Sequence, residues 1–232
     1  MATNRLLECL TRKDRAHLLD RCELVELTFP DILAEPGDAM LHVYFPTDSF
    51  ISLVSAVGTG DNLEVALAGN EGIYGVPVAL GVATSPVHAL VQGSGAAWRM
   101  GAGAFRRELA RSGPLRTCIN RYIYVLMSQL IHTAGCNRFH VVEQRVARWL
   151  LMTSDRANSP TFRITHEFLA YMLGVRRVGI TEAASALQRR GLIGYTRCVM
   201  TVVDRAGLEN AACSCYRSDI ATYKRIFGKD CA

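Results

Sequence analysis

No stretch of the 232-residue sequence is apolar for long enough to cross a lipid bilayer. The longest nearly apolar run, residues 73–83, contains Gly75, Pro77 and Gly81, whereas a membrane-spanning helix needs about 20 consecutive apolar residues. The N-terminus also lacks the apolar core of a secretory signal peptide. We therefore expect a cytoplasmic protein without membrane contact, whose eight cysteines are thiols rather than disulfides.

Residues 24–112 lack the side chains from which most active sites are built. Their only histidines are His42 and His88, and they contain neither clustered carboxylates for a metal ion nor a nucleophile motif. An enzyme on a small β-barrel is therefore the weakest alternative. We predict that the protein is not an enzyme and has no catalytic residues.

The cysteines do not follow a common metal-binding spacing. Cys213 and Cys215 are separated by one residue rather than the usual two or more, and no paired histidine accompanies them. A zinc site or a redox pair that includes Cys231 stays open as an alternative. We predict no bound metal and no cofactor.

Residues 24–112 read as a series of short strands. Turn-forming segments rich in Gly, Pro and Asp occur at 35–38, 58–61 and 69–72, and such spacing is typical of a small sandwich or barrel. The expected strands are residues 25–29, 41–45, 49–55, 63–67 and 88–92.

A long helix is predicted from Pro114 onward, because apolar residues recur there at alternating spacings of four and three. We expect this stripe to pack against a second copy of the helix, with packing against a neighbouring domain as the alternative. The sequence Gly135-Cys136-Asn137 predicts a hinge, after which a helix resumes over 140–153. The residues of the predicted dimer interface are Leu115, Ile119, Tyr122, Leu126, Gln129 and Thr133.

Residues 166–185 predict two short helices joined by a tight turn, the helix-turn-helix unit that places one helix in a DNA major groove. Thr165 is a suitable N-cap, and Gly174 lies where the first helix must end in a left-handed residue. The apolar positions that bury the two helices against each other are Leu169, Leu173, Val175, Ile180 and Ala183.

A wing follows the helix pair. Gly191 ends the second helix, and residues 193–203 alternate in the manner of a short β-hairpin. The combination predicts a winged helix-turn-helix.

Charge is distributed unevenly along the chain. Residues 138–205 contain 11 arginines, no lysine and five acidic residues, whereas residues 1–113 contain 9 basic and 13 acidic residues. A basic unit joined to an acidic one favours a polyanion-binding half and a half with another role.

A β-roll, a long helix, a hinge and a winged helix-turn-helix, in this order, resemble the Crp/Fnr family of bacterial transcription regulators. The most specific segments are residues 142–151, residues 165–193 and the turn Glu35-Pro-Gly-Asp38. The resemblance implies a homodimer that binds double-stranded DNA at a palindromic operator, and contact with RNA polymerase if it is an activator.

The resemblance also implies an α+β fold divided into four parts. Residues 1–113 are expected to form a cyclic-nucleotide-binding-like β-roll, a double-stranded β-helix of the jelly-roll kind, that acts as a sensor. Residues 114–137 would be the dimerisation helix and hinge, residues 138–217 the DNA-binding domain, and residues 218–232 a C-terminal tail.

One segment departs from the family pattern. Residues 69–75 occupy the place of the phosphate-binding segment, but residues 76–90 contain neither the Arg that would neutralise a cyclic phosphate nor the Glu that would hold the ribose. We therefore predict that cyclic AMP is not the ligand and that the effector is unknown. The residues of this degenerate pocket are Gly72, Tyr74, Gly75, Thr84 and Ser85.

Three other ways of sensing remain as alternatives. An uncharged molecule would suit the apolar segment 73–83, haem would need His88 as an axial ligand, and oxidation of Cys136 at the hinge would act on DNA binding. An iron–sulfur cluster fits poorly, because only Cys9 and Cys22 lie near the N-terminus.

The N-terminal turn of the second helix should meet the edges of the bases. Arg176, Arg177 and Thr181 are therefore the predicted base contacts, since Arg pairs with guanine through two hydrogen bonds. Of these, Arg177 matches the first base-contacting Arg of the family, whereas Val178 and Glu182 replace its following Glu and second Arg. The predicted phosphate contacts are Thr165, His166 and Arg197.

Overall fold

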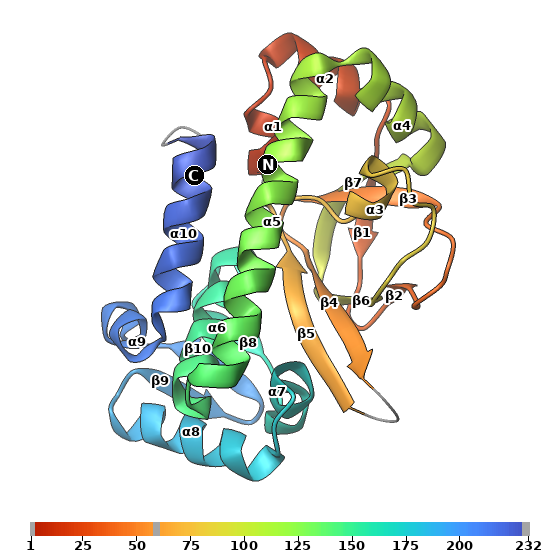
Figure 1. The fold of residues 1–232 in the computed structure, drawn as a ribbon. Coiled ribbons are helices and arrows are strands. Elements are labelled where there is room, and N and C mark those ends of the chain that lie inside the picture. Colours follow the sequence, from red (N-terminus) through yellow and green to blue (C-terminus); the bar gives the residue numbers. More distant parts are fainter. Residues whose placement is uncertain (1–2, 58–60, 229–232) are drawn as a thin grey trace.

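The computed structural model describes residues 3–57 and 61–228. An N-terminal β unit, the long helix α5 (Gly113–Phe139) and a C-terminal helical unit with a small sheet follow one another (Figure 1). This is the expected α+β architecture. No helix among the described residues is long and apolar enough to span a membrane.

The β unit consists of two antiparallel sheets around one core. The first sheet has the order β1 (Glu23–Leu27), β7 (Gly95–Gly101), β3 (His42–Pro46). The second has the order β2 (Ile32–Ala34), β6 (His88–Gly93), β4 (Phe50–Val57), β5 (Asp61–Ala68). Apolar side chains of both sheets, among them Phe45, Met100, Ile51 and Val91, belong to one buried cluster, which is how a half-buried sheet satisfies its apolar face.

Short helices close the ends of the β unit. They are α1 (Arg5–Glu8), α2 (Arg12–Leu19), α3 (Val76–Ala79) and α4 (Ala102–Arg111). The buried carboxylate of Glu108 in α4 lies 2.9 Å from the guanidinium of Arg21, which follows α2.

Helix α5 begins with Ser112, whose hydroxyl accepts a hydrogen bond from the backbone N–H of Leu115 at 3.2 Å, and with Pro114 in its first turn. It then continues through residues 135–137 to Phe139. The prediction of a hinge there is wrong. A glycine within a helix costs only about 1 kcal/mol relative to alanine, and the neighbouring Cys136 is buried, so packing holds this turn in helical form.

The C-terminal unit starts with α6 (Val142–Ala157), β8 (Thr161–Arg163), α7 (His166–Leu173) and α8 (Arg177–Arg189). A hairpin of β9 (Ile193–Thr196) and β10 (Val199–Val202) follows and completes a sheet of order β8-β10-β9. The chain ends in α9 (Arg205–Ala211) and α10 (Ser214–Phe227).

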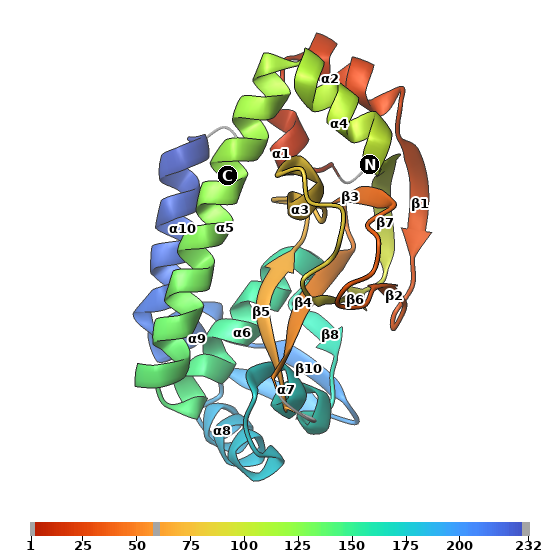
Figure 2. The same cartoon turned by 45° about the vertical axis from the view of Figure 1, so that its right-hand side comes forward.

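Helix α10 lies alongside α5 (Figure 2), so residues 218–227, expected as a tail, are part of a packed helix. The buried carboxylate of Asp219 explains this packing. It lies 2.7 Å from His132 Nδ1 of α5 and 2.9 Å from Arg148 Nη2 of α6.

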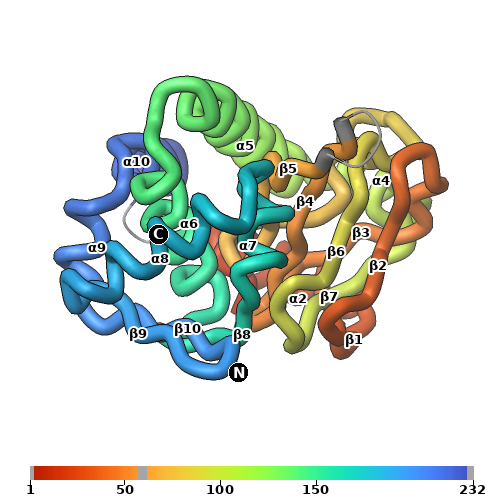
Figure 3. Tube along the Cα trace, turned by 90° about the horizontal axis from the view of Figure 1, so that it is seen from below, coloured from red at the N-terminus to blue at the C-terminus, as the bar shows by residue number. Residues whose placement is uncertain are grey.

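The β unit and the C-terminal unit share an interface. Seen from below, α7 lies beside β5 (Figure 3), and Val54 of β4 and Leu90 of β6 belong to the same apolar cluster as Trp149 of α6. Polar contacts also cross it. Trp149 Nε1 donates to Glu64 Oε1 at 2.8 Å, and the buried side chains of Arg156 and Glu71 lie 2.7 Å apart.

The Glu64 carboxyl lies inside this interface. Burial raises its pKa to about 7, and the hydrogen bonds from Ser52 and Trp149 and the positive charges of Arg156 and Arg148 lower it only in part. The hydroxyl of Ser52 contacts both Glu64 Oε2 and Gln92 Oε1, but it has one hydrogen to donate. The Ser52 hydroxyl donates to Glu64 Oε2 at 2.7 Å, and the Gln92 side-chain amide can then satisfy Ser52 Oγ by turning its NH₂ group towards it.

Stability should therefore depend on the protonation of Glu64. As the pH rises from about 4.5 to about 7, Glu64 loses its proton in the unfolded chain and keeps it in the folded protein. The free energy of unfolding should fall over this range, by at most about 3 kcal/mol from this group. Urea unfolding at a series of pH values measures the effect. In Glu64→Gln this component should vanish, and an identical pH dependence in the two proteins would contradict the assignment.

Candidate nucleic-acid interface

The turn between α7 and α8 has the local geometry that the sequence predicts. Thr165 Oγ1 accepts a hydrogen bond from the backbone N–H of Phe168 at 3.0 Å and so caps α7. Gly174 ends α7 with a φ of +59°. A Cβ at Gly174 would also lie 3.3 Å from the backbone oxygen of Asn62 and from Leu63 Cδ1. Glycine is therefore needed twice, for its backbone conformation and for the close approach of β5.

The apolar positions predicted for the helix pair face inward. Leu169, Leu173, Ile180 and Ala183 are buried, and Val175 packs against the same cluster. Residues of α6, including Trp149, Leu150 and Leu151, belong to this cluster too and support the two helices from behind. This packing holds α8 in place and leaves its opposite face to the solvent.

The three predicted base-contacting residues lie together on the exposed start of α8. Arg176 is the N-cap, Arg177 is the first helical residue, and Thr181 lies one turn later. Val178 is 67% exposed between them, and an apolar side chain there can contact a thymine methyl group. The exposed surface at this end of α8 thus has two guanidinium groups and one apolar side chain.

His166 connects the two helices and the wing. Its Nδ1 lies 3.1 Å from Thr181 Oγ1, and because that hydroxyl donates to the backbone oxygen of Arg177, the ring nitrogen is the donor. The imidazole stacks on Tyr195 of β9, with ring centroids 4.4 Å apart. Burial, and then the charge of Arg177, lower the pKa of His166. A neutral ring whose Nε2 is buried suits a positioning role better than the predicted phosphate contact.

The other two predicted phosphate contacts differ in availability. Thr165 is exposed, but its hydroxyl already caps α7. Arg197 is exposed at the tip of the wing, where both central residues of the β9–β10 turn, Arg197 and Cys198, have positive φ values, as a type I′ turn requires. Arg190, at the other end of α8, pairs with Glu143 at 2.7 Å and lies away from the N-terminal turn.

The predicted effector residues are packed rather than arranged around a cavity. A Cβ at Gly72 would meet the ring of Tyr122, and one at Gly75 would meet Val43 at 2.5 Å. Tyr74 and Ser85 are buried, and the Ser85 hydroxyl donates to the backbone oxygen of Val87 at 2.7 Å. Thr84 forms a β-bridge with Ala39. His88, the haem alternative, lies 2.7 Å from the Glu35 carboxylate.

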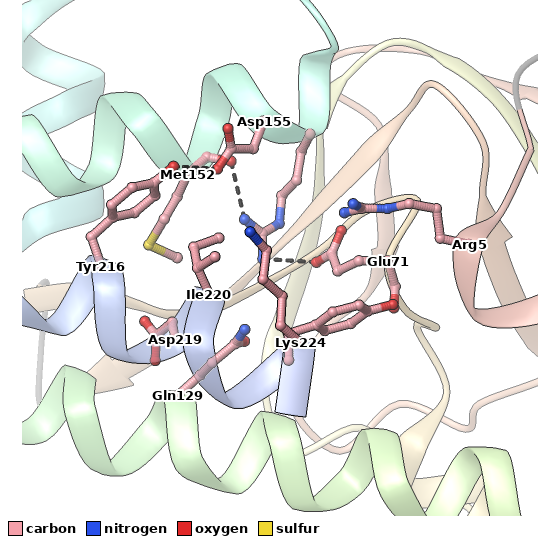
Figure 4. Close-up of a pocket in the computed structure, with 11 residues that line it drawn as sticks. Arg5, Glu71, Gln129, Met152, Asp155, Tyr216, Asp219, Ile220 and Lys224 are labelled. Atoms are coloured by element: carbon pink, nitrogen blue, oxygen red, sulfur yellow. Dashed lines mark hydrogen bonds and ion pairs between the residues drawn. The ribbon is translucent and has the colours of Figure 1, made fainter. Parts of the chain in front are cut away.

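A small cavity lies where the β unit, α5, α6 and α10 meet (Figure 4). Its volume is about 80 Å³, well below the roughly 300 Å³ at which small-molecule sites begin. Part of its polar lining is engaged in ion pairs and hydrogen bonds, as between Glu71 and Arg156 and between Asp155 and Tyr216, whereas Glu71 Oε2 and the Nε atoms of Arg5 and Arg156 have no hydrogen-bond partner among the described residues. It accommodates water rather than a nucleotide.

The predicted dimer seam is wrong. Leu115, Ile119 and Tyr122 are almost inaccessible and belong to the core of the β unit, and Leu126 is 9% exposed. Gln129 lines the small cavity, and Thr133 Oγ1 accepts a hydrogen bond from Arg148. The apolar stripe of α5 exists, but this face of the helix packs against other parts of its own chain. This corresponds to the alternative named in the sequence analysis, packing against a neighbouring domain.

Three cysteines and one histidine, from two separate segments of the chain, come together in the structure. Cys136 and His140 at the end of α5 lie beside Cys213 and Cys215 at the start of α10. The expectation that no histidine accompanies the Cys213/Cys215 pair is therefore wrong. The spacing of four residues between Cys136 and His140, which puts both on one helix face, was the sequence feature that could have indicated this cluster.

Six described cysteines are free thiols, whereas Cys9 is disulfide-bonded, contrary to the expectation of thiols throughout.

Comparison with known proteins identifies the helix-turn-helix unit. Residues 144–211 match the family model of the Crp-like helix-turn-helix domain, which spans α6 to the end of α9. Residues 144–211 thus form a Crp-like helix-turn-helix domain. The match bears out the resemblance noted in the sequence for this part of the chain. No curated protein sequence matches the chain.

Solved structures of bacterial proteins share the fold over most of the chain. A putative Crp/Fnr regulator from Eubacterium rectale is 17% identical with a TM-score of 0.68, covering 89% of this chain and 96% of its own. FixK2 from Bradyrhizobium japonicum is 12% identical with a TM-score of 0.70, covering 83% and 98%. The c-di-GMP-responsive regulator CLP from Xanthomonas campestris is 15% identical with a TM-score of 0.67, covering 82% and 98%.

Two arginines of this helix-turn-helix domain should have different effects on DNA binding. Arg177→Ala should cost about 1–3 kcal/mol and relax the base preference at one position of each half-site. Arg197→Ala should weaken binding to all sequences alike and reduce the salt dependence by about one ion. Selection of binding sites from random duplexes, followed by titration at several salt concentrations, separates these effects.

Arg111→Ala is the matched control, because it removes an exposed arginine from the β unit. It should change neither the preferred sequence nor the affinity. If Arg177→Ala kept the wild-type preference and only bound more weakly, the assignment of Arg177 as a base reader would be wrong.

Proposed function

We propose that the protein is a homodimeric transcription regulator that binds a palindromic operator through Arg176, Arg177 and Thr181. The exposed N-terminal turn of α8, with its two arginines, carries this proposal. The wild-type protein should select two inverted half-sites, with centres about 10–10.5 base pairs or a multiple of that apart. Selection that enriches no sequence would contradict it. As a DNA-binding regulator the protein acts in the bacterial cytoplasm, with RNA polymerase as a partner if it activates.

We assign one role to each of the domains expected from the sequence. Residues 1–113 serve as the sensor-like β unit, residues 114–137 as the dimerisation helix, and residues 138–217 as the DNA-binding domain. Helix α10 extends this last unit, because it packs on both α5 and α6.

Dimerisation uses the face of α5 that the β unit and α10 leave exposed. Tyr124, Met127, Leu130 and Ile131 lie on this face, and Met127 and Ile131 are 55% and 68% exposed. The spacing of Tyr124, Met127 and Ile131 is three and four residues, which gives a continuous apolar stripe. An exposed apolar stripe on a long helix is an interaction surface, and a second copy of α5 presents the complementary one.

The exposed face can be tested separately from the buried one. Ile131→Glu should give a folded monomer, because it places two like charges in the proposed interface without disturbing the core. Leu126→Glu should instead destabilise the chain itself, because the carboxylate would be buried within one protomer. Sedimentation velocity and thermal unfolding measure the two effects.

Leu41→Glu is the control, since Leu41 is 70% exposed on the β unit and its substitution should leave a stable dimer. A dimer of unchanged affinity from Ile131→Glu would exclude this face of α5. Loss of the dimer in the control as well would show that added charge alone prevents association.

The sensor region is proposed not to bind cyclic nucleotides. No arginine lies between Gly75 and Arg99, and the place of the phosphate is filled by packed side chains. The carboxylate of Glu71 adds negative charge nearby, although Arg156 compensates for it.

Calorimetry with cyclic AMP and cyclic GMP should therefore show no binding at micromolar concentrations. A cyclic phosphate needs a full positive charge in its pocket, and the described pocket residues offer none. Micromolar affinity for either nucleotide would contradict this proposal. It would mean that the β unit opens to expose a different site.

A further inference from the structure

We propose that Cys136, His140, Cys213 and Cys215 bind one Zn²⁺ ion. Three thiols and one imidazole form a common ligand set of structural zinc sites. The four ligand atoms lie within 4.8 Å of one another. A site of this size holds a single ion.

Two of the six distances between the ligand atoms can be compared with tetrahedral coordination. The Sγ atoms of Cys136 and Cys213 lie 3.5 Å apart, and Cys215 Sγ lies 3.7 Å from His140 Nδ1. With Zn–S and Zn–N bonds of about 2.3 and 2.0–2.1 Å, the edges of a tetrahedron are about 3.8 Å between two sulfurs and about 3.6 Å between sulfur and nitrogen. These two distances are thus close to those that the ion requires, and all others between the ligand atoms are at most 4.8 Å.

The surroundings are those of a closed structural site. Cys136, Cys213 and Cys215 are buried and form a cluster of their own, separate from the two larger apolar cores. Three thiolates and Zn²⁺ leave one net negative charge. Arg145 and Arg148 both lie close enough to interact electrostatically with Cys136 and Cys213. Arg148 also pairs with Asp219, so Arg145 adds positive charge beside the site.

Local structure presents the ligands from two helix ends. Cys136 and His140 lie one turn apart at the C-terminus of α5, where the backbone N–H of His140 donates to Cys136 O. Cys213 is the N-cap of α10, and Cys215 lies in its first turn. The partial positive charge at the N-terminus of this 14-residue helix favours thiolates there.

Two other uses of the cysteines fit less well. A disulfide between Cys136 and Cys213 would need the sulfurs at about 2.05 Å, and it would leave Cys215 and His140 without a role. An iron–sulfur cluster needs ligands spread around several iron atoms, whereas these four ligand atoms all lie within 4.8 Å of one another. Zinc uses all four ligands.

The position of the site in the chain gives the ion a structural consequence. Cys136 and Cys213 are 77 residues apart, and the whole Crp-like domain, residues 144–211, lies between the two pairs of ligands. The ion therefore joins the segments that enter and leave the DNA-binding domain. Because Cys136 and His140 lie at the C-terminal end of α5, the ion also attaches these two segments to the helix proposed to form the dimer.

Metal content tests the proposal directly. The wild-type protein should contain about one zinc ion per chain, and the reduced apoprotein should bind Co²⁺ with the thiolate-to-metal absorption bands of a tetrahedral site. Cys213→Ser should weaken Zn²⁺ binding by more than about 100-fold, since losing an outer-shell partner alone costs about 10–100-fold. His140→Cys should retain the ion as a four-cysteine site with an altered cobalt spectrum. Cys198→Ser, which removes a thiol of the wing, is the control and should bind metal as the wild type does.

Three results would overturn the proposal. One is a reduced wild-type protein that binds neither Zn²⁺ nor Co²⁺ at micromolar concentrations. Another is metal binding that is equal in the wild type and in Cys213→Ser. The third is purified protein that contains iron and sulfide instead of zinc. Because the wild type itself is measured, misfolding of a variant does not affect the first and third results.

Discussion

The structure depends on how the surface of helix α5 is divided. One face, with Leu115, Ile119 and Tyr122, completes the core of the β unit, and towards the C-terminus His132 meets the buried Asp219 of α10. The opposite face, with Met127 and Ile131, remains exposed. A helix of 27 residues is about 40 Å long, so it contacts the β unit, α10 and, in the proposed dimer, a second α5. Its position therefore determines where the DNA-binding domain lies.

Residues 69–75 contribute to the contact between the β unit and the C-terminal unit. Glu71 pairs with Arg156 of α6, its backbone oxygen accepts from Tyr223 of α10, and Gly69 lets Arg156 pack closely. A buried carboxylate requires a partner, and the arginine that provides it comes from the DNA-binding domain. The same segment thus contributes to the contact between the two units.

Residues that act locally could be predicted from the sequence, and residues that act at a distance could not. Thr165 and Gly174 define α7 through a cap and a left-handed turn, which depend on neighbouring residues alone. Strand β7 escaped prediction because Gly95-Ala-Ala has little strand propensity, and its central place in a sheet comes from β1 and β3. The stripe of α5 was recognised, but periodicity does not say what covers a face. The zinc ligands lie far apart in the chain, so only the fold unites them.

The orientation of the recognition helices follows from three contacts of the DNA-binding domain. They are β5 against α7 at Gly174, Arg156 with Glu71, and the α5–α10 packing beside the four proposed zinc ligands. A dimer on two half-sites tolerates little change in the separation of its helices, because the half-sites are a fixed number of base pairs apart. A signal that alters DNA affinity must favour one arrangement of these contacts over another. Glu64, whose pKa burial raises to about 7, lines the same small pocket as Cys136, one of the proposed zinc ligands. A proton on Glu64 and a metal ion at the proposed site would therefore act at neighbouring places in this domain.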